Sequence, residues 1–144
     1  MKTRGFSLLE LVVTMVIAGI LAAIAIPYFT DTDAKSTWYA EQVRAAARYA
    51  QRQAVAQRRV VYFVAQLSKV EVCYAVDISN HCVAGQRLTQ VTDGGAYSLA
   101  APSGVTINPE TTVSFTALGV PSGAASFSVG GHAVSVTAET GYVQ

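Results

Sequence analysis

The chain has 144 residues, a hydrophobic fraction of 51%, a mean hydropathy of +0.35 and a net charge of +1. This length suits one domain with an N-terminal extension, and the near-neutral charge argues against a generally basic nucleic-acid-binding protein. The charge is unevenly distributed, because residues 35–59 hold six basic residues and one acid, whereas residues 71–144 hold five acids and one basic residue, Arg87.

The first element is an apolar run from Phe6 to Ile26 in which Glu10 is the only charged residue. As a helix, its 21 residues would extend about 30 Å, which matches the hydrocarbon core of a bilayer. Lys2 and Arg4 precede it, so the positive-inside tendency predicts a cytoplasmic N-terminus and an exported remainder. The alternative is an ordinary secretory signal peptide cleaved near Ala23-Ile24-Ala25, but the run is longer than a signal-peptide core and contains a carboxylate.

Glu10 and Pro27 are the two unusual residues of this segment. A charge in the bilayer interior costs about 2.5–3.5 kcal/mol, so Glu10 indicates either a function or a position near the interface. Pro27 would bend a continuing helix by removing one hydrogen bond, or it would end the helix. We expect continuation, because helical periodicity resumes beyond it.

The second half of the expected helix is amphipathic. An apolar stripe at i, i+4, i+7 and i+11 predicts a face that packs on the rest of the domain. It consists of Val43, Ala47, Ala50 and Ala54. A helix from about Phe6 to about Gln57 would be roughly 75–80 Å long, which suits a filament subunit better than a small globular protein.

Three arginines follow an adjacent face of this helix at i+4 steps, namely Arg44, Arg48 and Arg52. A solvated face is one interpretation of this stripe. A charged seam that meets the acidic part of a neighbouring subunit is the second, and contact with DNA or acidic lipid is the third.

Beyond Arg59 the pattern changes to that of β-strands. Residues 60–65 form an apolar run, residues 66–69 suggest a hairpin turn, and residues 70–78 alternate as a half-buried strand with Glu71 on its polar face. Shorter alternating segments follow around Val113, Phe127 and Val134, separated by Gly- and Pro-containing turns. One long helix followed by strands predicts an α+β fold with an antiparallel sheet.

Cys73 and Cys82 are the only cysteines. We expect them to form a disulfide if the domain is exported, and free thiols are the main alternative. A metal site is disfavoured, because two cysteines at this spacing with one adjacent histidine, His81, do not form a zinc pattern. No nucleophile–base constellation, P-loop, dinucleotide fingerprint or HExxH motif occurs, so we predict neither a cofactor nor an enzymatic activity.

The N-terminal segment, from Lys2 to Val12, resembles the type IV prepilin signature: a short basic leader ending in glycine, then Phe, then Glu at the fifth mature position. The resemblance implies cleavage by a prepilin peptidase between Gly5 and Phe6, followed by N-methylation of Phe6. It also implies that Glu10 pairs with the terminal amine of a neighbouring subunit and acts as an assembly residue. Gly19 and Pro27 resemble the segment that unwinds or bends in filaments.

The rest of the chain is similar to the GspH/FimT group of minor pilins and pseudopilins, and within it to the MshC-like minor pilins of MSHA-type pili. The similarity rests on the Ala/Arg-rich helix end, the β-hairpin that follows it, and the residues of 115–123 and 139–143. It implies a type IV pilin fold and a structural subunit that assembles or caps a filament, with other pilin subunits, the prepilin peptidase and the inner membrane as partners.

Two further functions stay open as alternatives: a pseudopilin of a type II secretion system and a DNA-binding minor pilin. Some FimT-like relatives carry a G-R-x-R motif at the C-terminus. The corresponding tail here, residues 141–144, has uncharged residues at both arginine positions, which argues against nucleic acid as a partner.

The sequence therefore predicts four segments. They are a cleaved leader over residues 1–5, a transmembrane or filament-core helix over 6–27, an amphipathic continuation over 28–58, and a β-rich domain over 59–144. The last is expected in the periplasm, attached to the inner membrane by the single apolar helix until the subunit is assembled into a filament.

Overall fold

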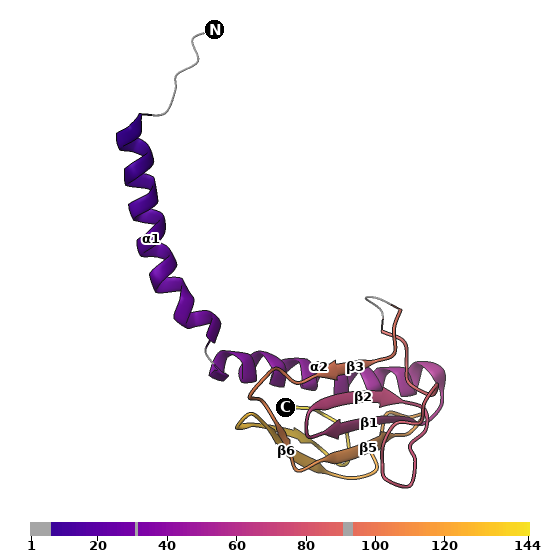
Figure 1. The fold of residues 1–144 in the computed structure, drawn as a ribbon. Coiled ribbons are helices and arrows are strands. Elements are labelled where there is room, and N and C mark those ends of the chain that lie inside the picture. The colour runs from indigo at the N-terminus through magenta and orange to yellow at the C-terminus, as the bar shows by residue number, and fades with distance from the viewer. Residues whose placement is uncertain (1–6, 31, 91–93) are drawn as a thin grey trace. The chain divides into compact units, whose positions relative to one another are not determined.

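The computed structural model describes residues 7–30, 32–90 and 94–144, which divide into two units (Figure 1). One unit ends at Ala34 and the other comprises Lys35–Gln144. Of residues 24–30 only the helical backbone is described.

The first unit contains helix α1, Leu8–Thr30. The helix continues past Pro27 by three residues, so the proline does not end it. From Leu8 to Leu21, Glu10 is the only charged residue and Thr14 the only other polar one, and Ala18 and Gly19 are the only small residues among large apolar ones. Helix α1 therefore has no polar face, in contrast to an ordinary surface helix.

The second unit begins in helix α2, Thr32–Gln57, and contains all of the strands. Alanine is frequent in α2 and neither Gly nor Pro interrupts it, which favours the helical conformation. The expected apolar stripe is confirmed, since each of its four residues is buried. The full buried set is Ser36, Tyr39, Ala40, Val43, Ala46, Ala47, Ala50 and Ala54.

In the described part of the chain, seven strands form two antiparallel sheets, whereas the sequence suggested one sheet. The first sheet has the order β3-β2-β1-β5 and the second has the order β4-β6-β7. The strands are β1 (Val61–Gln66), β2 (Lys69–Cys73), β3 (Ser98–Ala100), β4 (Ile107–Asn108), β5 (Thr111–Phe115), β6 (Ala125–Val129) and β7 (His132–Val136). Strands β3 and β4 are too short to produce a periodic pattern in the sequence, which is why they were not predicted.

The expected hairpin is confirmed, because Gln66 pairs with Lys69 across a two-residue turn between β1 and β2. Strands β6 and β7 form a second hairpin in which Val129 pairs with His132 across Gly130 and Gly131. Both glycines have positive φ, as such a turn requires.

One cluster of buried apolar side chains joins α2 to both sheets. The rings of Phe63 in β1 and Phe127 in β6 stack with their centroids 6.0 Å apart, so the core is continuous between the sheets. Tyr39 of α2 is fully buried and donates its hydroxyl hydrogen to the carbonyl of Leu99 at 2.9 Å. This burial raises the pKa of Tyr39 to about 12.

The prediction of a half-buried strand over residues 70–78 is wrong in two respects. Strand β2 ends at Cys73, and Ile78, which was expected on the buried face, is fully exposed. Glu71, which was expected on the polar face, is 2% exposed. The reason is that the segment after β2 folds back. Arg87 forms an isolated main-chain β-bridge with Cys73. Cys82 lies with Val64 and Cys73 in a second small apolar cluster.

Candidate assembly helix and surface sites

The start of α1 is capped by the side chain of Ser7. The main-chain amide of Glu10 donates to the hydroxyl oxygen of Ser7 at 3.2 Å, and that of Leu11 donates to the carbonyl of Ser7 at 3.2 Å. Ser7 is thus the N-cap and Glu10 is the third helical residue, where a carboxylate also interacts favourably with the helix dipole. Gly5 and Phe6, the predicted cleavage and methylation positions, lie outside the described residues.

The large apolar side chains of α1 from Leu8 to Leu21 are about half or more exposed. Leu8, Leu9 and Leu21 lie on different sides of the helix, and each of them is more than half exposed, as is Met15. A helix with apolar residues on all sides is ordinarily covered by a membrane or by other protein chains. Within the three described ranges of residues, no helix is both long and apolar enough to cross a membrane.

Gly19 lies inside α1, and a Cβ atom added there would meet no other atom within 4 Å. Packing among the described residues of its own unit therefore does not require this glycine. Position 27 is helical, but the side chain of Pro27 lies outside the described residues, so the expected bend stays a prediction.

Two members of the predicted arginine stripe bind main-chain carbonyls of their own domain. Arg44 donates to the carbonyl of Ala133 at 2.8 Å and forms an ion pair with Glu41. Arg48 donates to the carbonyl of Val143 at 2.9 Å. These two side chains therefore attach α2 to β7 and to the C-terminal tail.

Arg52 lies in an open groove of about 520 Å³ between α2 and the tail. Tyr142, which is 62% exposed, lines the same groove. The remaining lining residues are Ala45, Arg48, Gln51 and Val143. The sequence placed Arg52 on a surface stripe but gave no sign of this groove.

Gln51 connects α2 to two loops at once. Its amide nitrogen donates to the carbonyls of Gly119 at 2.9 Å and Thr140 at 2.8 Å. The tail that follows lies beside β7, where Ser135 and Gln144 exchange two main-chain hydrogen bonds. Gly141 thus occupies a structural position, because its φ is +67° and a Cβ there would come within 2.5 Å of the Gln51 amide nitrogen.

Cys73 and Cys82 form a disulfide with a Cα–Cα distance of 5.8 Å, as expected for an exported domain. The loop that they close is ordered by Asp77, whose carboxylate accepts hydrogen bonds from the amides of Ser79 and His81, both at 2.9 Å. These bonds, that of His81 above all, lower the pKa of Asp77.

The two histidines lie in different parts of the second unit. His81 is exposed on the disulfide loop. The Nε2 atom of His132 is 3.1 Å from the hydroxyl oxygens of both Ser36 and Thr37, so it connects β7 to the start of α2. Among the described residues, no group of three or more His, Cys, Asp or Glu side chains could hold a metal ion.

Sequence reasoning missed the buried ion pairs of Glu71. Its Oε1 atom lies 3.0 Å from Lys69 Nζ and 2.9 Å from Arg87 Nη2. Lys69 and Glu71 are two residues apart and so share a strand face, a signal that could have suggested their pairing. The approach of Arg87 depends on how the segment after β2 folds and has no local signal.

Comparison with known proteins agrees with this architecture. Residues 1–26 match a family model described as the prokaryotic N-terminal methylation motif. Two crystal structures of the type IV minor pilin FimU from Pseudomonas aeruginosa (strain PAO1) resemble the chain, with TM-scores of 0.52 and 0.53 and sequence identities of 21% and 19%. The similarity covers 73% of this chain in both cases, and 87% and 83% of the FimU chains.

The chain has a type IV pilin fold. A helical N-terminal part followed by antiparallel sheets is the arrangement that it shares with FimU. Residues 1–26 match the N-terminal methylation motif. No curated protein matches the chain significantly.

Proposed function

We propose that this protein is a minor pilin, a subunit that enters a type IV pilus through α1 and displays the second unit on the filament. The main support is that α1 presents exposed apolar side chains on all sides and carries one carboxylate in its first turn. Most of this helix lies within the methylation motif matched over residues 1–26. In a filament, neighbouring helices would cover those side chains. The protein has a structural role in this proposal and no catalytic one.

Before assembly, the precursor is anchored in the inner membrane by α1, with its N-terminus in the cytoplasm and the β-rich unit in the periplasm. The basic residues Lys2 and Arg4 favour this orientation. The disulfide between Cys73 and Cys82 is consistent with an oxidising compartment. A prepilin peptidase then removes residues 1–5, and Phe6 becomes the methylated N-terminus.

Between a pilus and a type II secretion system, the pilus is the better-supported destination. The C-terminal part resembles MshC-like minor pilins, and the matched crystal structures are those of a type IV minor pilin. Immunogold labelling of sheared pili tests this point, because a pseudopilin would be found with the secretion system and not along or at the end of surface pili.

Processing provides the first test of the proposal. Intact-mass analysis of protein from cells with a prepilin peptidase should give a chain that begins at Phe6 and carries one added methyl group. Gly5→Asp should leave the precursor uncut, whereas Gly19→Ala, a matched glycine change inside α1, should be processed normally. A chain that begins after Ala25 would instead identify an ordinary secretory protein.

A further inference from the structure

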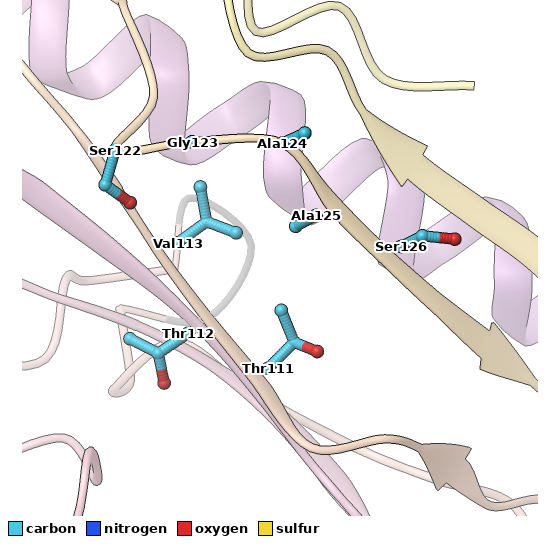
Figure 2. A pocket seen from close by; sticks show the side chains of 8 residues that line it. All are labelled: Thr111, Thr112, Val113, Ser122, Gly123, Ala124, Ala125 and Ser126. Atoms are coloured by element: carbon cyan, nitrogen blue, oxygen red, sulfur yellow. The ribbon is translucent and has the colours of Figure 1, made fainter.

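Strands β5 and β6 are neighbours at one end and separate at the other. The segment just before β6 is hydrogen-bonded to β5: the amide of Ser122 donates to the carbonyl of Ser114 at 2.8 Å, and the amide of Ser114 donates to the Ser122 hydroxyl at 3.3 Å. Beyond this point no main-chain hydrogen bond joins β5 to β6 in the described part of the chain. A cleft of about 420 Å³ lies between them (Figure 2).

The β5 wall of this cleft has unpaired main-chain groups. Hydrogen-bonding directions alternate along a strand, so the amide and carbonyl of Thr112 point to the same edge as those of Ser114, away from β1. No described residue forms a main-chain hydrogen bond with Thr112 at that edge. The Thr112 hydroxyl donates to the carbonyl of Asn80 at 3.3 Å and so is engaged elsewhere.

The β6 wall is open because β4 is short. Strand β4 pairs only with Ser128 and Val129 of β6, and the amide of Gly130 donates to the carbonyl of Thr106 at 2.9 Å. By the same alternation, the amide and carbonyl of Ser126 point away from β7, toward the edge of β6 that β4 occupies only at Ser128 and Val129. Both walls therefore present the unpaired groups of a sheet edge, which is a template for another strand.

The lining residues indicate which strand would fit. Figure 2 shows Thr111 and Val113 on one side of β5 and Thr112 on the opposite side. The inner side adjoins the buried side chains of Val113 and Phe127, whereas the outer side carries Thr112 and Ser126. None of the eight lining residues is charged, so no side chain of the cleft complements an acidic or a basic partner.

We propose that this cleft binds an extended, uncharged peptide segment of another protein, which adds as a strand between β5 and β6. Such a segment would alternate small apolar residues, facing the core, with small polar residues, facing solvent. Its own amides and carbonyls would satisfy those of Thr112 and Ser126, which a nucleic acid or a lipid could not do in register. No residue of α1 lines the site.

Amide hydrogen exchange of the full chain in detergent micelles tests this proposal. In the free chain, the amides of Thr112 and Ser126 should exchange faster than those of Val113 and Phe127, which pair within their sheets. The probe is the peptide Ac-(Val-Ser)3-NH2, which at saturation should slow the exchange of Thr112 and Ser126 by about tenfold or more. The control is the same peptide with alternate amides N-methylated, because it keeps the side chains and loses main-chain donors.

A pair of lysine variants locates the effect. Ser126→Lys places a charge on β6 beside the open part of its edge. Ser128→Lys places the same charge on the same face of β6, but at a residue that pairs with β4. With both variants folded by circular dichroism, Ser126→Lys should abolish the slowing at Thr112 and Ser128→Lys should retain it. Three results would overturn the proposal. The first is that the Thr112 and Ser126 amides are already protected from exchange in the free chain, and the second is that millimolar peptide does not slow their exchange. The third is that exchange slows equally when the peptide is N-methylated or when the chain carries Ser126→Lys.

Discussion

Helices α1 and α2 have similar lengths, 23 and 26 residues, but they place their apolar side chains differently. Helix α2 buries one face, mostly of alanines, in the core of its own unit. Helix α1 exposes large apolar side chains on all sides within its unit. The second unit itself thus accounts for the pattern of α2, whereas the described residues of the first unit supply no cover for the apolar side chains of α1.

The apolar residues of α2 are mostly smaller than those of α1, and this difference in size also separates a helix that packs on its own domain from one that does not. Small alanines let α2 approach the sheets closely, and the buried Tyr39 and Val43 fill the remaining space. The Leu, Ile and Val side chains of α1 suit contact with lipid tails or with other helices. The experiments that follow test this distinction between a helix that is folded by its own domain and a helix that is completed by others.

The largest effect is expected for Glu10. Glu10→Val should be inserted and processed normally, but its recovery in sheared filaments should fall. Loss of one partner from a buried charge pair costs about 3–5 kcal/mol, or at least about a hundredfold in an equilibrium. The measurements are the membrane fraction, the processed mass and the amount in filaments.

Glu10→Gln is the matched control, because glutamine also serves as the third residue of a capping box but carries no charge. If the charge pair governs assembly, Glu10→Gln and Glu10→Val should be lost from filaments equally. Normal incorporation of Glu10→Gln alone would assign Glu10 to helix capping with Ser7. Normal incorporation of both variants would leave it without an assembly role.

The next effect compares two valines. Val43 of α2 is fully buried, and Val16 of α1 is 56% exposed. Val43→Ala should destabilise the second unit by about 2 kcal/mol through lost burial and a cavity. Val16→Ala should leave the same thermal transition unchanged, and because both changes lie in helices, their helix-propensity gains are matched. An equal loss for Val16→Ala would show that α1 folds against its own domain.

A smaller effect concerns the attachment of the tail to α2. Gly141→Ala and Gly131→Ala both place a Cβ at positive φ, at about 1 kcal/mol each. Only at Gly141 would the Cβ also meet the Gln51 side chain and, at 3.0 Å, the carbonyl of Gly119. Gly141→Ala should therefore lose about 1–2 kcal/mol more in denaturant unfolding. Equal losses would show that the Gln51 hydrogen bonds contribute nothing to stability.

The smallest effect is expected for DNA binding. Arg44 and Arg48 already bind carbonyls of their own domain, and the tail contains no arginine. Fluorescence anisotropy should give weak binding that declines steeply as salt is raised, and Arg52→Ala should change it by no more than about twofold. Tight binding that survives replacement of Arg44, Arg48 and Arg52 by alanine would reveal another nucleic-acid site.

The sequence by itself determined the features that have a local signal. The order of residues in the first segment gave the prepilin-like motif. The period-3.6 spacing of apolar residues gave the continuation of the helix past Pro27, the end of α2 and the buried stripe around Val43. The β1–β2 hairpin and the cores of β5, β6 and β7 follow from period-2 alternation and turn residues. The disulfide between Cys73 and Cys82 followed from their number and the expected compartment.

Only the tertiary structure decided which surfaces became covered. Alternation assigned Glu71 and Ile78 to opposite faces of one strand, but the segment that folds back after Cys73 buried the first and left the second exposed. The partners of Arg44 and Arg48, and the cleft between β5 and β6, depend on residues far apart in sequence. Periodicity states that two faces of an element differ, whereas burial depends on what packs against each face, and that is set by long-range contacts.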